Sequence, residues 1–342
     1  MFHLYDEDGW INILEIAKLK KWLNVIIGPR QVGKTYGTLK LMLDEDLYFL
    51  YMRRTIKEFE MMEHDPDLNP FLKMEREGYH VDIVTKGKNR LIGHVDVNEE
   101  KTKITRKIAS GMTLEEVASV RGFSGDRFSD LVFDEFIPEH IVRKRQGEGV
   151  AFLNAYVTIN GNRELEGRPP LRCWLLANSN DLTSPILSEL GLTGEVERLI
   201  RTGKEYTIKD GFFLALTKSE KIIEKRKDTA LMKHLKGKGR FYEMAMENQF
   251  AYNDLSQIQS MSNKGMKCLF QFGNIYVYDN GEIYYCCRIR GNTRRVYDNT
   301  SSGSRKCQLE FPYIRAMYAV GYVRFDSMAT MSEFKNFFKI ND

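Results

Sequence analysis

The 342-residue sequence has no apolar run that approaches the ~20 residues that a membrane-spanning helix needs. Residues 1–8 are acidic and lack the basic-then-apolar order of a signal peptide. Cysteine is scarce: the five cysteines are an odd number, and no two have Cys-x-x-Cys spacing. These absences argue against a membrane span, a disulfide framework and a structural zinc site. They favour a protein of the reducing cytosol.

The residues that are present are typical of a soluble globular protein, with 42% hydrophobic and 29% charged side chains, and the length favours two domains. The net charge of +4 hides an asymmetry. Residues 226–342 hold 18 Lys and Arg against 11 Asp and Glu, whereas residues 1–225 hold 33 against 36. A basic C-terminal part favours contact with a polyanion. A chance imbalance on a solvated surface is the competing explanation.

Short, continuously apolar runs recur through the first 216 residues, each bounded by charge or glycine. Runs of this kind are typical of strands buried on both faces of a parallel sheet. Helix-like segments lie between several of them, and this alternation predicts an α/β fold. The expected strands are 22–27, 47–52, 130–133, 172–177 and 212–216, and the expected helices are 34–43, 55–63 and 150–159.

Two other parts of the chain have a different pattern. Segments 79–84 and 91–97 alternate in polarity and predict an antiparallel hairpin inserted in the parallel domain, and Thr113 with Glu116 predicts a capping box that opens a short helix. The tail predicts a small α+β domain with a turn at Asp279-Asn280-Gly281. Its expected strands are 267–277, 282–289 and 306–311, and its expected helices are 312–320 and 327–338.

The strongest motif is Gly28-Pro29-Arg30-Gln31-Val32-Gly33-Lys34-Thr35, a complete phosphate-loop (Walker A) sequence between a predicted strand and a predicted helix. The glycines let backbone N–H groups turn toward phosphates, and the helix N-terminus adds partial positive charge. Lys34 is expected to contact the β- and γ-phosphates, and the Thr35 hydroxyl is expected to bind Mg²⁺. A chance glycine-rich loop is the alternative.

A second motif follows about 100 residues later, where an apolar strand ends in Asp134 and Glu135. Asp134 is placed to hold Mg²⁺ through water, and Glu135 is placed to activate the attacking water. This Walker B-like pair therefore indicates an ATPase rather than a kinase, because the adjacent glutamate implies that water is the nucleophile. Without the apolar strand before it, an Asp-Glu pair would usually lie in an ordinary solvated loop. An Asn-Lys-x-Asp guanine motif is absent from the sequence, which weakens a GTPase interpretation.

The next predicted strand ends in Asn178-Ser179-Asn180-Asp181. A polar residue there can contact both the γ-phosphate and the attacking water, so Asn178 is the candidate sensor and Asn180 the second choice. A helix cap or turn is the alternative. Oligomeric ATPases commonly borrow an arginine from a neighbouring subunit. The candidates are Arg30, Arg121, Arg127, Arg143, Arg145, Arg163 and Arg168, and surface solvation is the simpler explanation for each one.

Several motifs in order resemble viral DNA-packaging ATPases, in particular those of small, protein-primed tailed phages of the phi29-like group. They are the phosphate loop, Tyr51-Met52-Arg53-Arg54, Arg121-Gly122-Phe123-Ser124-Gly125-Asp126, Phe133-Asp134-Glu135-Phe136, Asn162-Arg163-Glu164 and Arg172-Cys173-Trp174-Leu175-Leu176-Ala177-Asn178. The resemblance covers roughly residues 20–180. It implies a P-loop NTPase fold of the additional-strand catalytic-glutamate class, with ATP and Mg²⁺ as cofactors.

The resemblance also implies partners and residue roles. In this family a homo-oligomeric ring, usually of five subunits, sits on the portal of an empty capsid and drives double-stranded DNA inside; relatives in this group dock through a structural RNA. Arg163 would be the trans-acting finger, Arg121 an interface residue and Arg30 an arginine acting in cis. The protein would work in the host cytoplasm, transiently on the procapsid, and be absent from the mature virion.

The family's C-terminal domain resembles a ribonuclease H fold, which in large terminases cuts DNA with clustered carboxylates and two metal ions. Here the strands 268–277 and 282–289 offer only Glu282, at an edge, so we expect a vestigial, non-cutting domain. The predicted domains are an ATPase domain at 1–200, a basic linker at 201–240 and a nucleic-acid-binding domain at 241–342. The alternatives are a hexameric helicase or translocase, a terminase with active nuclease, and a nucleotide-gated scaffold that barely hydrolyses ATP.

Overall fold

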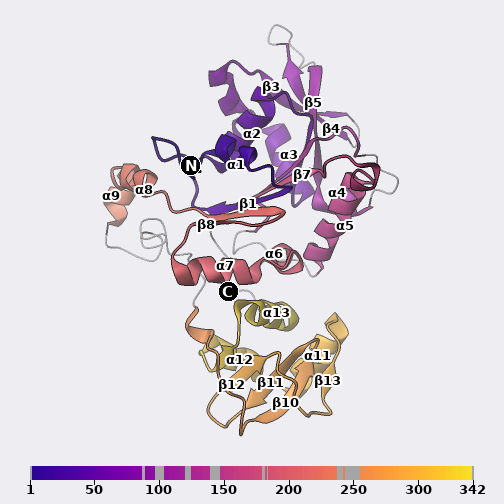
Figure 1. Cartoon of the computed structure of the whole chain (residues 1–342), viewed down its shortest axis with the longest axis vertical. Helices are drawn as coiled ribbons and strands as arrows, with labels where there is room; N and C mark the ends of the chain where they lie inside the picture. Colours follow the sequence, from indigo (N-terminus) through magenta and orange to yellow (C-terminus); the bar gives the residue numbers. More distant parts are fainter. Residues whose placement is uncertain are drawn as a thin grey trace. The chain divides into compact units, whose positions relative to one another are not determined.

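The computed structural model describes residues 2–86, 89–96, 104–119, 125–138, 147–178, 182, 184–236, 242 and 255–340. The chain forms two units (Figure 1). Unit 1 comprises residues 1–138, 150–180 and 202–251, and unit 2 comprises residues 139–149, 181–201 and 252–342. This division differs from the predicted one. Residues 202–251 belong with the large sheet instead of forming a separate linker, and residues 181–201 belong with the C-terminal unit.

Unit 1 is built on a nine-stranded sheet with the order β3-β4-β5-β2-β6-β7-β1-β9-β8 in the described part of the chain. The strands are β1 (Leu23–Gly28), β2 (Phe49–Arg53), β3 (Val81–Lys86), β4 (Asn89–Val95), β5 (Ile104–Thr113), β6 (Asp130–Asp134), β7 (Arg172–Asn178), β8 (Tyr206–Ile208) and β9 (Phe212–Leu216). Neighbours from β5 to β9 are parallel, whereas β3, β4 and β8 are antiparallel to their neighbours. Strand β7 lies between β1, which leads into the phosphate loop, and β6, which ends in Asp134.

The buried strands confirm the sequence pattern, since every residue of β1 and β6 is buried. The predicted hairpin is also present as β3 and β4, although part of its turn lies outside the described residues. Strand β5 was not predicted, because its first half is exposed and carries Thr105, Arg106 and Lys107. It joins the hairpin to β2 and so extends the parallel core into one mixed sheet.

The helices of unit 1 connect these strands. They are α1 (Ile13–Lys18), α2 (Lys34–Asp44), α3 (Ile56–His64), α4 (Leu114–Ser119), most of α5 (Glu148–Asn160), α8 (Glu220–Lys227) and α9 (Ala230–Leu235), with short 3₁₀ helices at Pro66–Leu68, Leu72–Glu77 and Glu164–Glu166. The predicted capping box of α4 is confirmed: Glu116 N donates to Thr113 Oγ1 at 3.2 Å, and Thr113 N donates to the Glu116 carboxylate at 2.8 Å.

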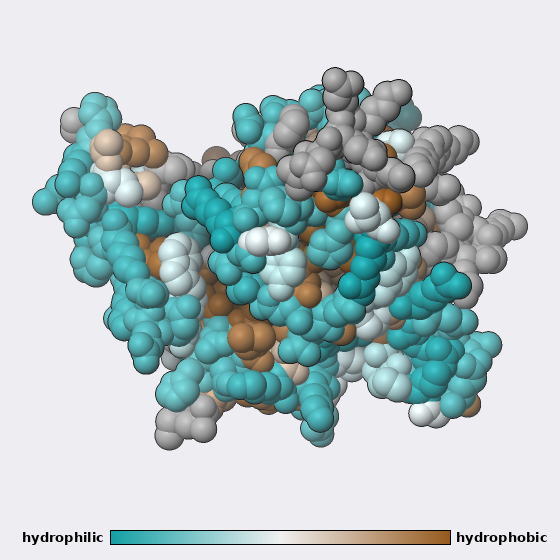
Figure 2. All heavy atoms as spheres, turned by 90° about the horizontal axis from the view of Figure 1, so that it is seen from above, coloured by the Kyte–Doolittle hydropathy of each residue, from teal (hydrophilic) through white to brown (hydrophobic). Residues whose placement is uncertain are grey.

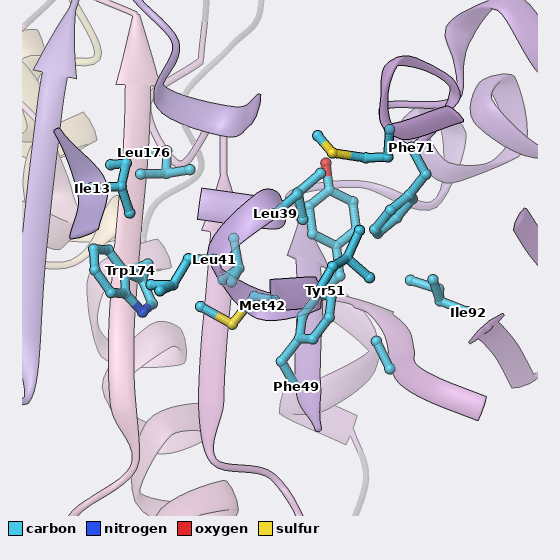
Figure 3. Packing of buried hydrophobic residues seen from close by; sticks show 14 of the residues in the cluster. Ile13, Leu39, Leu41, Met42, Phe49, Tyr51, Phe71, Ile92, Trp174 and Leu176 are labelled. Carbon is cyan, nitrogen blue, oxygen red and sulfur yellow. The ribbon is translucent and has the colours of Figure 1, made fainter. Parts of the chain in front are cut away.

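A hydrophobic cluster holds α2 against the sheet (Figure 3). Leu39 and Met42 of α2 belong to it together with Tyr51 of β2, Trp174 of β7 and Phe71. Burial of each side chain of this size contributes ~1.5–3 kcal/mol to folding. The helix that begins at Lys34 therefore has a fixed position over the strands that carry the other site residues.

Unit 2 contains a five-stranded sheet with the order β13-β10-β11-β12-β14 in its described part. The strands are β10 (Lys267–Phe272), β11 (Ile275–Asp279), β12 (Tyr284–Cys287), β13 (Val296–Tyr297) and β14 (Val323–Phe325), and the helices are α6 (Pro185–Glu189), α7 (Thr193–Thr202), α11 (Ser301–Glu310), α12 (Ile314–Ala319) and α13 (Met328–Phe338). Within the unit, the Met328 N–H at the start of α13 donates to the Glu197 carboxylate of α7 at 2.8 Å.

Two expectations for the tail are corrected. The segment 267–277 is itself a hairpin, because β10 and β11 pair antiparallel, and the turn at 279–281 then joins β11 to β12. The segment 306–311 lies mostly in helix α11, not in a strand. Thr300 caps this helix, and its buried residues Gly303, Ser304 and Cys307 follow helical spacing.

No helix among the described residues is long and apolar enough to cross a bilayer. Figure 2 shows one face of the molecule, where hydrophilic side chains dominate and hydrophobic ones occupy small separate areas.

Candidate active site

The phosphate loop runs from the end of β1 to the start of α2. Gly28 has no room for a side chain, because a Cβ there would lie 1.7 Å from Thr217 Oγ1. Gly33 has a φ of +90° and precedes the first residue of α2, so it turns the chain into the helix in a conformation that glycine adopts without strain. Both glycines of the motif are thus required by the local structure.

Lys34 is 7% exposed and its ammonium lies inside the loop. Its Nζ donates to Gly28 O at 2.9 Å and Pro29 O at 2.8 Å, and it lies 3.4 Å from Asn178 Oδ1. Burial lowers the pKa of Lys34 to about 8, and the negative charge of Asp134 opposes this shift only in part. The carbonyl groups satisfy its hydrogen bonds but do not neutralise its charge, so the position suits an anionic ligand.

The pKa of Lys34 predicts that nucleotide affinity depends on pH. In the free protein Lys34 loses its proton as the pH rises through about 8, whereas bound phosphates favour the charged form and raise its pKa. Binding then takes up a proton, and ADP affinity should fall by up to about tenfold per pH unit above that value. Calorimetric titration with ADP between about pH 7 and pH 9 measures this. Lys34→Arg, which stays charged, is the control, and an equally steep fall in that variant would contradict the assignment.

Thr35 and Asp134 come together at the carboxyl edge of the sheet. Thr35 Oγ1 donates to Asp134 Oδ1 at 2.9 Å, and the buried Tyr51 hydroxyl donates to Asp134 Oδ2 at 3.0 Å. A hydroxyl and a carboxylate beside a phosphate loop are the oxygen ligands that Mg²⁺ prefers. The donor set therefore fits Mg²⁺ held by these two residues together with nucleotide phosphates. Among the described residues, no group of three or more His, Cys, Asp or Glu side chains gathers as a metal site.

Arg53, at the end of β2, binds both carboxylates of the second motif. Its guanidinium is 13% exposed and donates to Asp134 Oδ2 at 3.1 Å and to Glu135 Oε2 at 2.7 Å. Glu135 itself has a φ of +55°, a rare and strained conformation for this residue, and its side chain is 44% exposed. The structure thus holds Glu135 at the sheet edge in an ion pair with Arg53.

In the sequence, Arg53 stood out only as part of the segment 51–54, which resembles a segment of the packaging ATPases. The available signal was a cation at the end of a predicted strand. The strand order was needed to show that this strand lies next to β6. Asn178, the predicted sensor, does lie at the phosphate loop through its contact with Lys34. Asn180, Arg121, Arg143 and Arg145 lie outside the described residues.

Arg163 lies elsewhere than expected. It is 6% exposed, and its Nη2 donates to Gly125 O at 2.9 Å and to Phe128 O. The guanidinium therefore binds the loop that leads into β6 of its own chain, instead of being solvated at the surface. Of the other arginines, Arg30 and Arg127 are exposed, and Arg168 pairs with Asp126 and Glu166.

This placement predicts a structural effect of Arg163→Ala. The change leaves two carbonyl groups of the buried loop without their donor, and it should lower the free energy of unfolding by about 2–4 kcal/mol. Chemical denaturation measures this, with the exposed Arg168→Ala as the control. In mixed assemblies with Glu135→Gln subunits, recovery of ATP turnover would show instead that Arg163 acts on a neighbour's site.

Comparison with known proteins gives the family and the fold of this chain. The family model for podovirus DNA encapsidation protein (Gp16) matches residues 5–284. No curated protein matches the chain. Among solved structures, the fold is similar to the DNA packaging motor protein gp11 of phage Phi-28, with a TM-score of 0.65, 18% identity and coverage of 98% of this chain and 100% of that chain.

A second solved structure, the viral genome packaging motor assembly of bacteriophage Phi-29, gives a TM-score of 0.62 and 20% identity over 96% of this chain and 99% of that chain. At these sequence identities, the similarity of this chain to the two solved structures establishes the fold alone. The family model spans most of the chain, from before the phosphate loop into unit 2. The chain therefore belongs to the podovirus DNA encapsidation protein (Gp16) family.

Proposed function

We propose that this chain is the ATP-hydrolysing subunit of a viral motor that moves double-stranded DNA into an empty capsid through the portal. The observation that carries the proposal is the convergence of Thr35, Asp134 and Glu135 beside the buried Lys34 in a member of this family. A phosphate loop alone would suit a nucleotide-gated scaffold. A carboxylate placed beside the metal-binding residues favours hydrolysis.

In the proposed mechanism, loop N–H groups and Lys34 bind the nucleotide phosphates, and Thr35 with Asp134 would hold Mg²⁺. The metal ion would neutralise charge at the transferred phosphoryl group. Glu135 accepts a proton from the attacking water. Because Arg53 binds this carboxylate at 2.7 Å, Glu135 must leave that ion pair, or share it, to reach the water. Asn178, beside Lys34, is placed to respond to the γ-phosphate, and Arg30 is the proposed cis-acting arginine.

The fold supports the finer class proposed from the sequence. Strand β7 is the additional strand between β1 and β6, and Glu135 follows β6 as the catalytic glutamate. We further propose a homo-oligomeric ring, pentameric when assembled on the procapsid in the host cell, in which a neighbouring chain supplies an arginine. Arg163 could fill that role only after releasing Gly125 O and Phe128 O, and Arg121 is the second candidate.

Unit 2 is proposed to contact nucleic acid, DNA or a packaging RNA, through its backbone phosphates. Its exposed basic side chains include Lys264, Lys267, Arg288, Arg290, Arg294, Arg295, Arg305 and Lys306. Contacts of this kind are independent of sequence and weaken steeply with salt. The vestigial ribonuclease H-like character of this unit remains a prediction.

ATP turnover tests the proposed function. We expect the full chain to hydrolyse ATP slowly alone and faster with double-stranded DNA and empty capsids that carry their portal. Stimulation by DNA alone, with no further effect of capsids, would favour a general translocase. The appearance of DNA nicks with Mg²⁺ or Mn²⁺ would favour a terminase with active nuclease, and ATP binding without turnover would favour a scaffold.

A further inference from the structure

The junction between β9 and α8 lies directly against the phosphate loop. Thr217, which follows β9, donates its N–H to Ile27 O at 2.8 Å, and its Oγ1 fills the space beside Gly28. Ser219 then caps α8 by accepting a hydrogen bond from Ile222 N. Helix α8 therefore begins next to the first residue of the loop.

The N-terminal segment ties α8 to the other end of the same loop. Ile11 N donates to Val32 O at 3.0 Å, and the Ser219 hydroxyl donates to Gly9 O at 2.6 Å. Gly9 is so close to α8 that a Cβ there would lie 2.7 Å from Lys221 Cβ. The short stretch from Gly9 to Ile11 thus bridges the loop and the helix, in agreement with the path of the N-terminus in Figure 1.

Three consecutive cations end α8, and only the middle one lacks an anionic partner among the residues that the structure describes. Lys225 Nζ lies 3.1 Å from the Asp8 carboxylate, and Lys227 Nζ lies 2.5 Å from the Glu224 carboxylate. Arg226 is half-buried, and its buried Nε has no hydrogen-bond partner. Burial without a compensating carboxylate lowers the pKa of Arg226.

The charge of Arg226 acts on the phosphate loop. Burial is the main cause of the lowered pKa of Lys34, and among the neighbouring cations Arg226 lowers that pKa more than Arg30 does. Electrostatic interaction is appreciable only between charges that lie in the same neighbourhood, so Arg226 of α8 is one of the charged neighbours of Lys34. Two cations from separate elements thus interact electrostatically at the phosphate loop, and neither forms an ion pair with a carboxylate among the residues that the structure describes.

We propose that Arg226 binds the phosphate chain of the nucleotide that the loop of the same chain holds, an inference that rests on the proposed ATPase function. A guanidinium offers several N–H donors in a planar arrangement that matches phosphate oxygens. Arg226 is then a nucleotide-binding residue contributed by α8.

The test compares Arg226→Ala with Lys227→Ala in the full-length chain. These neighbours carry the same charge, but Lys227 pairs with Glu224 at the surface. By calorimetry we expect Arg226→Ala to bind ATP about tenfold to hundredfold more weakly, the cost of a lost charge-assisted hydrogen bond. Lys227→Ala should bind within about twofold of wild type. Arg226→Lys should recover part of the loss, and it serves in place of alanine if Arg226→Ala does not fold.

Hydrogen exchange gives a second measurement that does not depend on turnover. ATP should slow amide exchange in α8 of the wild-type chain and of Lys227→Ala, and have little effect on α8 of Arg226→Ala. Equal ATP affinity of Arg226→Ala and wild type, while Lys34→Ala loses binding, would overturn this inference and leave the proposed function standing. Equal losses in Arg226→Ala and Lys227→Ala would also overturn it. A wild-type chain that binds no ATP would overturn both.

Discussion

Glu135→Gln should bind ATP with nearly wild-type affinity and hydrolyse it about 10²- to 10⁴-fold more slowly. The amide keeps the size of the side chain but cannot accept the proton of the attacking water. Lys34, Thr35 and Asp134, which bind the phosphates and the metal ion in the proposed site, are unchanged. Single-turnover hydrolysis, measured together with ATP affinity, separates the two effects.

A suitable control is Glu45→Gln. Glu45 is exposed and lies at the C-terminal end of α2, whereas the phosphate loop lies at its N-terminal end. It should retain full turnover. If Glu135→Gln also retained full turnover in purified protein, Glu135 would not be the base. The carboxylate would then serve mainly as the ion-pair partner of Arg53.

Lys34→Ala should lose both ATP binding and hydrolysis. Removal of the ammonium takes away the charged group nearest the proposed phosphate position, and we expect ATP affinity to fall by about 100-fold or more and turnover to fall to background. The fold should persist, because the change also removes the cost of burying a charge without a neutralising partner. We expect the free energy of unfolding to change by less than about 2 kcal/mol.

Lys40→Ala is the matched control on the same helix, since Lys40 lies near the solvent and pairs with Asp44 and Glu77. It should bind and hydrolyse ATP as the wild type does. A Lys34→Ala protein that unfolds at much lower denaturant concentration than Lys40→Ala would assign Lys34 a structural role. A Lys34→Ala protein that still hydrolyses ATP would contradict the phosphate-site assignment.

The parallel core could be predicted from the sequence because its strands are buried on both faces and so appear as continuous apolar runs. Strand β5 could not, since half of it is exposed and its pairing with β2 depends on residues distant in sequence. The unit boundaries were also missed. Residues 181–201 belong to unit 2 and residues 202–251 return to unit 1, and composition does not reveal a chain that leaves a unit and comes back.

The candidate site combines local and distant residues in the same way. The positions of residues in contiguous motifs, from Gly28 to Thr35 and at 134–135, could be predicted because the strand, turn and helix around them have local signatures. Arg53 reaches the site from β2, and only the strand order brings it there. Arg226, which we propose as a phosphate contact, belongs to α8, and the β9–α8 junction that brings this helix to the loop has no local sequence signature. Arg163 was expected either to act on a neighbouring subunit or to be solvated, but its guanidinium binds carbonyl groups of a buried loop in its own chain.

Protection of DNA from nuclease inside capsids is the most direct test of the central claim that ATP hydrolysis by this chain drives DNA packaging. Empty capsids with their portal, double-stranded DNA, ATP and Mg²⁺ are incubated with the full-length chain, treated with DNase, and the protected DNA is measured. We expect genome-length protection with wild type and with Glu45→Gln, and none with Glu135→Gln. Equal protection with Glu135→Gln, or none with a wild-type chain that hydrolyses ATP on these capsids, would show that ATP hydrolysis by this chain does not drive packaging.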